Sequence, residues 1–124
     1  MFKKTAAKGK DVDHSECQRQ LMAINDALDI IRGKWKIQII TTLRFGKRRF
    51  KELQREISGI TARMLSKELR DLEMNQLVIR TVHNTIPVTV EYSLSEYGQT
   101  LDKVIDELRV WGLQHRKRII KKAV

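Results

Sequence analysis

The stretch Phe50–Asn75, FKELQREISGITARMLSKELRDLEMN, decides the fold because it has the pattern of two short helices joined by a tight polar turn. Apolar residues recur at helical spacing as far as Ile57, and Ser58-Gly59 then breaks the pattern. Thr61 is a suitable N-cap for a second helix. The apolar stripe of that second helix consists of Leu65, Leu69 and Leu72. The stretch therefore predicts a helix-turn-helix.

The opposite face of the second helix carries long cationic and small polar side chains, namely Arg63, Ser66, Lys67 and Arg70. An amphipathic helix with a basic outer face is often only a solvated surface helix. In a helix-turn-helix, the same arrangement suits a recognition helix. Its buried side holds it on a scaffold, while its exposed side offers donors to phosphates and guanine edges. We expect these four residues, and Thr61 at the helix N-terminus, to contact DNA.

Positive charge is concentrated in particular parts of the chain, whose formal net charge is +10. Residues 30–70 hold twelve Lys and Arg against three Asp and Glu, whereas residues 71–115 hold three against seven. Further cations lie in residues 1–10 and in the segment from Arg116 onward. Such segregation favours a polyanion on one face, and double-stranded DNA is the first candidate.

Length and composition predict one helix-rich globular domain. A hydrophobic content of 41% with 32% charged residues fits a folded chain, and 124 residues suffice for one core. No apolar run approaches about 18 residues, so we expect no membrane contact. The basic start MFKKTAAKGK lacks the apolar segment of a secretory signal. A single cysteine, Cys17, cannot form an internal disulfide, which suits a reducing cytoplasm.

Ahead of the helix-turn-helix, the sequence predicts a basic, flexible arm over residues 1–16 and a helix from about Cys17. The apolar residues of this helix follow a narrow, coiled-coil-like 3-4-3 spacing: Leu21, Ile24, Leu28 and Ile31. They either pack on the body of the domain or meet a second copy of the chain. A second helix, from about Lys34 to Phe45, uses Trp35 as a core anchor and ends at Gly46.

Further cations stand at the threshold of the helix-turn-helix, in the segment Lys47-Arg48-Arg49. They either grip phosphates or are merely solvated. We expect contacts to the DNA backbone from this threshold and from the helix that follows it, through Arg48, Arg49, Lys51 and Gln54.

A β-hairpin is expected directly after the recognition helix. The segments Leu77–Asn84 and Val88–Ser95 are rich in β-branched residues, and the second alternates apolar and polar side chains. The short link with Pro87 predicts a turn between two strands. A hairpin in this place is a wing, and we expect it to reach the backbone or the minor groove through Arg80, His83, Asn84 and Thr85.

Ser95 is expected to cap a last long helix with a broad apolar stripe. So long a helix cannot bury its whole stripe on so small a body. Together with the first helix, it is therefore the candidate dimer interface. The predicted interface residues are Leu21, Ile24, Leu28, Leu101, Val104, Leu108 and Trp111. Residues 116–124 then form a basic tail, which leaves residues 17–115 as the domain.

No catalytic or metal-binding pattern accompanies these features in the sequence. The three histidines, His14, His83 and His115, show no metal-ligand spacing among themselves or with Cys17. The sequence lacks G-x-S-x-G, P-loop and G-x-G-x-x-G motifs, and its carboxylates are not paired for acid–base chemistry. We therefore expect neither an enzyme nor a cofactor or metal site.

Short motifs in a fixed order resemble the HxlR-type transcriptional regulators over roughly residues 17–115. They are Gly33-Lys34-Trp35, Arg49-Phe50 with Leu53, Ile57-x-Gly59-Ile60, Met64-Leu65, Leu69-x-x-Leu72-Glu73, Leu77-Val78-x-Arg80, Pro87, Glu91-Tyr92-x-Leu94, Gly98, Leu101 and Trp111-Gly112. The resemblance implies a bacterial or archaeal, MarR-like winged helix-turn-helix, mainly α with a small β-hairpin wing. It also implies dimerisation through the first and last helices, with Thr61–Asn75 in the major groove of operator DNA.

One departure from this family concerns a thiol. Several members sense oxidants or electrophiles through a Cys near the start of the first helix, about thirteen residues before the Trp. Here that position holds Met22, and Cys17 lies five residues further upstream. We therefore expect Cys17 to be buried or idle, with a sensor as the alternative.

The sequence thus predicts a homodimeric, sequence-specific DNA-binding regulator, either a repressor or an activator, acting on a pseudo-palindromic operator. One alternative is a winged helix used as a protein-interaction module. Another is a non-specific, nucleoid-type DNA binder. The local charge of +9 over residues 30–70 disfavours the first alternative, because a protein-binding face would show exposed apolar residues there. A small-molecule effector between the long helices and the DNA-binding lobe is a further expectation, and its identity stays open.

Overall fold

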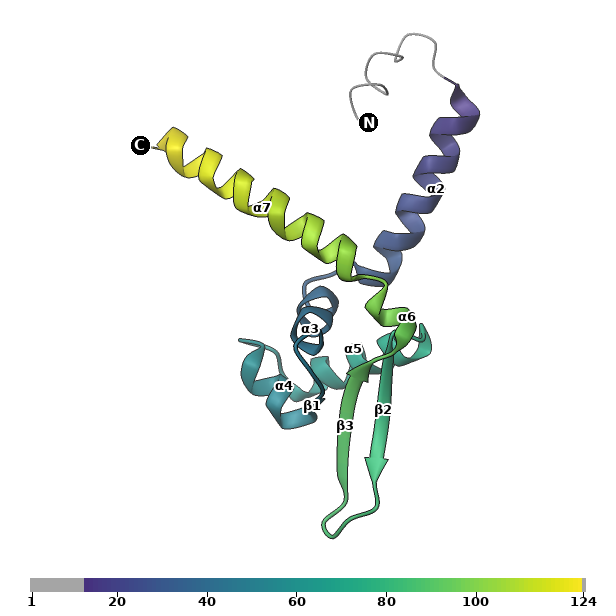
Figure 1. Ribbon diagram of the computed structural model, residues 1–124, viewed down its shortest axis with the longest axis vertical. Helices are drawn as coiled ribbons and strands as arrows, with labels where there is room; N and C mark the ends of the chain where they lie inside the picture. The colour runs from purple at the N-terminus through teal and green to yellow at the C-terminus, as the bar shows by residue number, and fades with distance from the viewer. Residues whose placement is uncertain (1–12, 124) are drawn as a thin grey trace. The chain divides into compact units, whose positions relative to one another are not determined.

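The structure is a computed structural model and describes residues 13–123 of the chain. The chain divides into two units, residues 1–32 and 33–124. The second unit combines helices with a small three-stranded antiparallel sheet (Figure 1). The prediction of a mainly helical winged helix-turn-helix is confirmed. None of the helices within residues 13–123 is both long enough and apolar enough to cross a membrane.

The first unit contains α2 (His14–Ile31). Its N-cap is Asp13, whose carboxylate accepts a hydrogen bond from the backbone N–H of Ser15 at 3.0 Å. The expected start near Cys17 was thus three residues late, and residues 14–16 belong to the helix instead of the predicted arm. The remainder of that arm, residues 1–12, lies outside the described residues. No residue of α2 is fully buried.

Three helices of the second unit enclose the core: α3 (Lys36–Leu43), α4 (Phe50–Glu56) and α5 (Ala62–Met74). Helix α3 is shorter than the expected Lys34–Phe45, and Trp35, expected as a core anchor, is its half-buried N-cap residue. The largest fully buried side chains are Ile39, Ile40, Leu53, Leu65, Leu69 and Leu72. The apolar stripe predicted for the recognition helix is therefore confirmed as core.

The turn between α4 and α5 follows the sequence prediction. Gly59 has φ of +85°, a left-handed conformation that glycine adopts without steric cost. The hydroxyl of Thr61 accepts a hydrogen bond from the backbone N–H of Met64 at 3.1 Å, so Thr61 caps α5 as expected. The cap and the glycine turn fix where α5 begins relative to α4.

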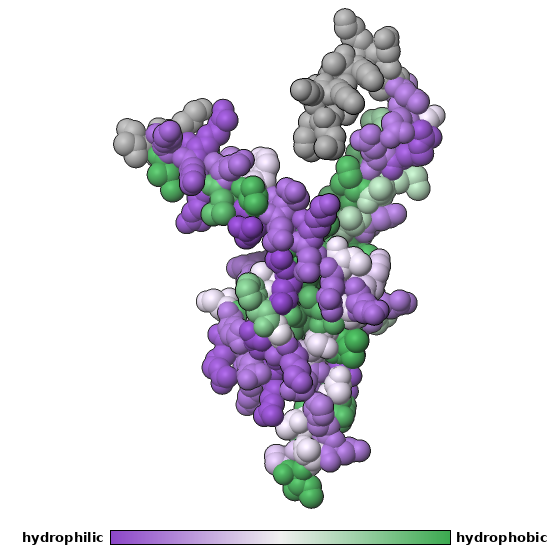
Figure 2. All heavy atoms as spheres, viewed as in Figure 1, coloured by the Kyte–Doolittle hydropathy of each residue, from purple (hydrophilic) through white to green (hydrophobic). Residues whose placement is uncertain are grey.

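The sheet contains β1 (Arg48–Arg49), β2 (Val78–His83) and β3 (Thr89–Leu94), in the order β1-β3-β2. Strands β2 and β3 form the predicted hairpin, each slightly shorter than expected. Strand β1, which pairs with β3, was not predicted, because two residues cannot show a period. The hairpin extends beyond α3, α4 and α5 in Figure 1, and its far end carries apolar atoms in Figure 2.

The expected last helix is broken into α6 (Glu96–Gln99) and α7 (Asp102–Ala123). Ser95 caps α6 as predicted, since its hydroxyl accepts from the backbone N–H of Gly98 at 2.8 Å and donates to the carbonyl of Gln76 at 2.6 Å. A Cβ on Gly98 would lie 2.2 Å from the carbonyl oxygen of Leu77, so this close approach requires glycine. Beyond the break, α7 continues through the segment predicted as a basic tail.

Candidate nucleic-acid interface

The outer face of α5 presents the side chains predicted to contact DNA. Arg63, Lys67 and Arg70 are exposed, and Ser66 is half-buried. With Met64, these four side chains line one shallow hollow of about 440 Å³. The helix therefore separates an apolar buried face from a cationic exposed face.

The cations of this face differ in their partners. Lys67 lies 3.2 Å from the carboxylate of Asp71, one helical turn away. Within residues 13–123, neither Arg63 nor Arg70 forms an ion pair. A guanidinium without an internal carboxylate partner can offer its fork of donors to a guanine edge or a phosphate.

An ion-pair network holds α5 from behind. The ammonium of Lys36 on α3 lies 2.5 Å from Glu68 and 3.3 Å from Asp71. Burial lowers the pKa of Lys36, but its hydrogen bonds to the two carboxylates outweigh burial and hold that pKa above its ordinary value. The hydrogen bond from Lys67, opposed by burial and helped by Lys36, holds the pKa of Asp71 below its ordinary value. The network orients α5 on α3.

Among the threshold residues, Arg48 is already engaged inside the fold. Its guanidinium lies 2.9 Å from Glu56 and donates to the carbonyls of Gly46 and Lys47 at 2.9 and 3.1 Å. A phosphate would have to compete with Glu56 for this side chain, although the contact stays a prediction.

The other threshold residues keep their side chains nearer to solvent. Arg49 and Lys51 are exposed, and Gln54 is half-buried. The backbone N–H of Arg49 donates to Glu52 at 2.8 Å, which fixes the first turn of α4. Arg49 and Lys51 are thus the more available cations of this group.

On the wing, Arg80, Asn84 and Thr85 are exposed, whereas His83 is half-buried. The Nε2 atom of His83 lies 2.7 Å from Glu91 on the neighbouring strand, and Lys47 approaches the same carboxylate at 3.6 Å. The hydrogen bond with His83 is the main cause of a lowered pKa at Glu91, against burial and with help from Lys47. His83 is therefore part of an internal contact, and Arg80 is the exposed cation of the wing.

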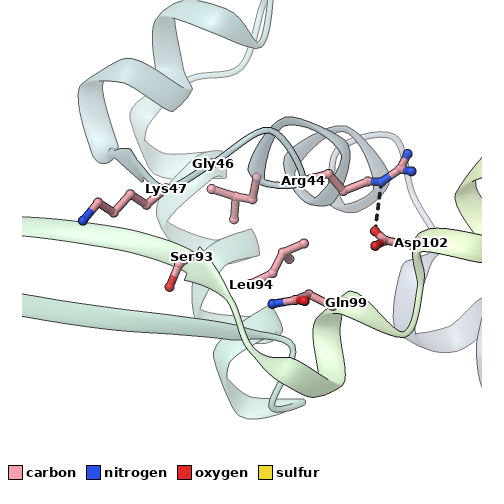
Figure 3. A pocket seen from close by; sticks show the side chains of 8 residues that line it. Arg44, Gly46, Lys47, Ser93, Leu94, Gln99 and Asp102 are labelled. Atoms are coloured by element: carbon pink, nitrogen blue, oxygen red, sulfur yellow. Dashed lines mark hydrogen bonds and ion pairs between the residues drawn. The ribbon is translucent and has the colours of Figure 1, made fainter.

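A second hollow, of about 320 Å³, lies where the end of α3 meets β3 and the start of α7 (Figure 3). Arg44 bridges to α7 there, with its Nε 3.0 Å from Asp102 and an Nη 2.9 Å from Asp106. The hollow is lined by Leu43, Arg44, Gly46, Lys47, Ser93, Leu94, Gln99 and Asp102.

Lys36 and Arg44 are the structural cations that the sequence argument missed. Lys36 is the first residue of α3 and Arg44 follows its last, and both bind carboxylates far along the chain, on α5 and α7. A cation on a helix with a buried apolar face indicates a partnered group, but the pattern does not name its partner.

The predicted dimer stripes are at the surface of the single chain. Leu21, Ile24 and Leu28 of α2 are each about half exposed, as are Val104 and Leu108 of α7. Trp111 is 66% exposed, and its ring stacks on that of His115 at a centroid distance of 5.0 Å. Leu101, in contrast, lies in the link before α7 and is half-buried.

The single cysteine and the possible metal ligands form no site among the described residues. Cys17, expected to be buried or idle, is exposed on α2, so it is not buried, and an idle thiol stays a prediction. Among residues 13–123, no three His, Cys, Asp or Glu side chains gather in a way that could hold a metal ion.

The chain is similar to known transcriptional regulators in sequence and in structure. It is 40% identical over 104 residues to the uncharacterized HTH-type transcriptional regulator YtcD of Bacillus subtilis, covering 84% of this chain and 82% of YtcD. The solved structure of the redox regulator HypR in its reduced form superimposes with a TM-score of 0.75 at 38% identity, covering 80% of this chain and 98% of HypR. A MarR-family transcriptional regulator from Enterococcus faecalis V583 gives a TM-score of 0.74 at 37% identity, covering 82% and 92%.

The sequence model of the HxlR-like helix-turn-helix family matches residues 30–120, which include the whole helix-turn-helix, the wing and most of α7. The resemblance expected from the short motifs is thereby confirmed. The relatives that the chain matches are described as HTH-type transcriptional regulators. The chain belongs to the HxlR-like helix-turn-helix family of transcriptional regulators.

Proposed function

We propose that the protein is a sequence-specific regulator that binds a pseudo-palindromic operator as a homodimer in the cytoplasm. Each subunit places α5 in the major groove, and the two helices read half-sites about one helical turn apart, about 10 base pairs. One observation supports this proposal most. Arg63 and Arg70 are exposed and form no ion pair within residues 13–123, whereas the other face of α5 is buried through Leu65, Leu69 and Leu72.

The roles of the polar residues follow from their positions. Arg63, Ser66, Lys67 and Arg70 contact base edges or the nearest phosphates, and Thr61 sits where the N-terminus of α5 meets a phosphate. The sugar–phosphate backbone is contacted from the neighbouring elements by Arg48, Arg49, Lys51, Gln54, Arg80, His83, Asn84 and Thr85. Contacts of this second kind position the protein without reading sequence.

Dimerisation covers the exposed stripes of the two long helices. In α7, Val104, Leu108 and Trp111 recur at helical spacing and line an almost wholly apolar surface with Lys103 and Glu107. An exposed stripe of this kind costs solubility unless a second surface covers it. A second copy offers the same stripe and the stripe of α2, which is also about half exposed.

The hollow beside Arg44 is the place for a small-molecule effector. It touches α3, which supports α5 through Lys36, and the start of α7, whose stripe we assign to the dimer. A ligand that displaced Asp102 from Arg44 would loosen the connection between these two elements. The effector would thereby couple DNA binding to dimer geometry.

Selecting binding sites from a random DNA pool with the purified protein tests the proposal. The affinity for the recovered site is then compared with that for scrambled DNA at one fixed salt concentration. We expect an inverted repeat and a preference of about a thousandfold or more. A ratio near unity identifies a non-specific, nucleoid-type binder, and no binding at low salt identifies an interaction module.

A further inference from the structure

The far end of the wing is apolar and uncovered. Ile86 is 103% exposed and Val88 is 60% exposed, both in the link between β2 and β3. Val82, which pairs with Val90 in the last part of the hairpin, is 48% exposed. Single exposed apolar residues are ordinary, but a group gathered at the end of a protruding hairpin indicates a contact surface (Figure 2).

The charge of the wing favours DNA as the occupant of this surface. Residues 76–90 contain no Asp or Glu, and they carry Arg80 and His83. Within residues 13–123, Arg80 forms no ion pair. The one acid of the hairpin, Glu91 on β3, is already paired with His83 and Lys47. An apolar tip on a segment that carries Arg80 and no acid fits a polyanion that also offers apolar surface, and the sugars and base steps of the minor groove are such a surface.

A second copy of the chain fits the tip less well. A stable protein interface buries about 800 Å² on each partner. The tip offers only the few apolar side chains around Ile86, so it cannot supply that area. One inserted side chain, by contrast, is enough to alter a base step of DNA.

We infer that Ile86 is an apolar wedge that enters the minor groove beside each half-site and bends the DNA there. The inference rests on the proposed DNA-binding function and extends it to a residue that makes no polar contact. Apolar side chains inserted at a base step unstack it partly and bend the duplex toward the major groove, by roughly 20–90° in known cases. Arg80 then contacts the sugar–phosphate backbone of the DNA next to the inserted Ile86.

The wedge adds sequence preference at base pairs that α5 does not touch. Pyrimidine–purine steps, such as TA and CA, unstack and kink most easily. Operators should therefore carry such a step at a fixed distance outside each major-groove half-site.

The test uses the full chain and its selected operator, with fluorescent dyes at the DNA ends and 2-aminopurine scanned through the flanks. Wild-type protein should raise energy transfer between the dyes and raise 2-aminopurine fluorescence at one step. At saturating protein, Ile86→Ala should lose more than half of both signals, and its affinity should fall about three- to tenfold. Ile79→Ala, the same substitution at the base of the wing, should leave all three quantities unchanged.

Three outcomes would overturn the inference. DNA binding by the wild type without bending or unstacking refutes the wedge alone and leaves the proposed function standing. A change in oligomeric mass on Ile86→Ala makes the tip a protein contact. No DNA binding by the wild type removes the wedge together with the proposed function. Because Ile86 is fully exposed, Ile86→Ala should unfold at the wild-type temperature.

Discussion

The ammonium of Lys36 lies 2.5 Å from the carboxylate of Glu68 and 3.3 Å from that of Asp71, so this one cation joins α3 to the back of α5. Only 12% of the Lys36 side chain and 16% of the Glu68 side chain are exposed. Because the pair is mostly shielded from water, each charge depends on the other for its solvation. The orientation of α5 thus depends on a contact on its buried side and not on its exposed cationic face.

Replacing Lys36 should therefore destabilise the fold. Lys36→Met leaves Glu68 without its main partner, and the free energy of unfolding should fall by about 1–3 kcal/mol. Arg19→Met is the matched control, because it breaks an exposed pair with Glu16 and should cost clearly less stability than Lys36→Met. Urea denaturation measures both. Equal losses for the two variants would mean that the Lys36–Glu68 pair does not hold α5.

The stability of this network should depend on pH in the acid range. The pKa of Asp71 lies below its ordinary value of 3.8 in the folded protein, chiefly because Lys67 donates to it. The folded state therefore binds this proton less readily than the unfolded chain. The resulting stabilisation is present above about pH 3.8 and is lost as the pH falls through the folded value.

Asp71→Asn removes this dependence. The variant should be less stable than the wild type at pH 7, and the difference should shrink below about pH 4. Unfolding curves recorded at several pH values between 7 and 3 provide the measurement. A difference that stays constant over this range would contradict the assigned role of Asp71.

Part of this architecture follows from the sequence because its causes are local. The stripe Leu65, Leu69 and Leu72 has the helical period, and Thr61 stands at the position of an N-cap, so α5 could be placed almost to the residue. The hairpin was equally clear from β-branched residues on either side of a short turn.

The remaining features depend on contacts between distant parts of the chain. Strand β1 exists because β3 pairs with it, and the break before α7 accompanies the close approach of Gly98 to Leu77. The partners of Lys36 lie 32 and 35 residues away. No period or cap encodes such distances, so the exposed cations of α5 were found while the residues that support the helix were not.

Cys17 should have no regulatory role. It is exposed on α2, so a thiol reagent can reach it in the folded protein. Alkylating it should leave the DNA affinity unchanged, because α2 makes no proposed DNA contact and Cys17 is not among the proposed dimer residues. The affinity of protein treated with iodoacetamide is the measurement, with Cys17→Ser as the control. A loss of affinity that Cys17→Ser resists would instead make Cys17 a sensor.

Placing a charge in the stripe of α7 should separate the subunits. Leu108→Glu introduces an unpaired carboxylate into the proposed interface, which is costly to bury. The variant should be monomeric at concentrations where the wild type is dimeric. Val110→Glu is the control, because Val110 is exposed on the same helix about 200° around from Leu108. The Val110→Glu variant should stay dimeric. Light scattering after size-exclusion chromatography gives the masses. A wild type that is monomeric at micromolar concentration would refute the dimer.

The central claim is that the outer face of α5 reads base edges of the operator. The most direct test measures affinities for every single-base variant of the selected operator. Arg70→Ala should lose discrimination at one symmetric position in each half-site, by about 1–3 kcal/mol. Lys51→Ala, which removes a proposed contact to the DNA backbone, should weaken binding to all operator variants alike. It should also reduce the slope of log affinity against log salt concentration by about one unit. A uniform loss across all variants with Arg70→Ala, indistinguishable from Lys51→Ala, would contradict base reading by α5.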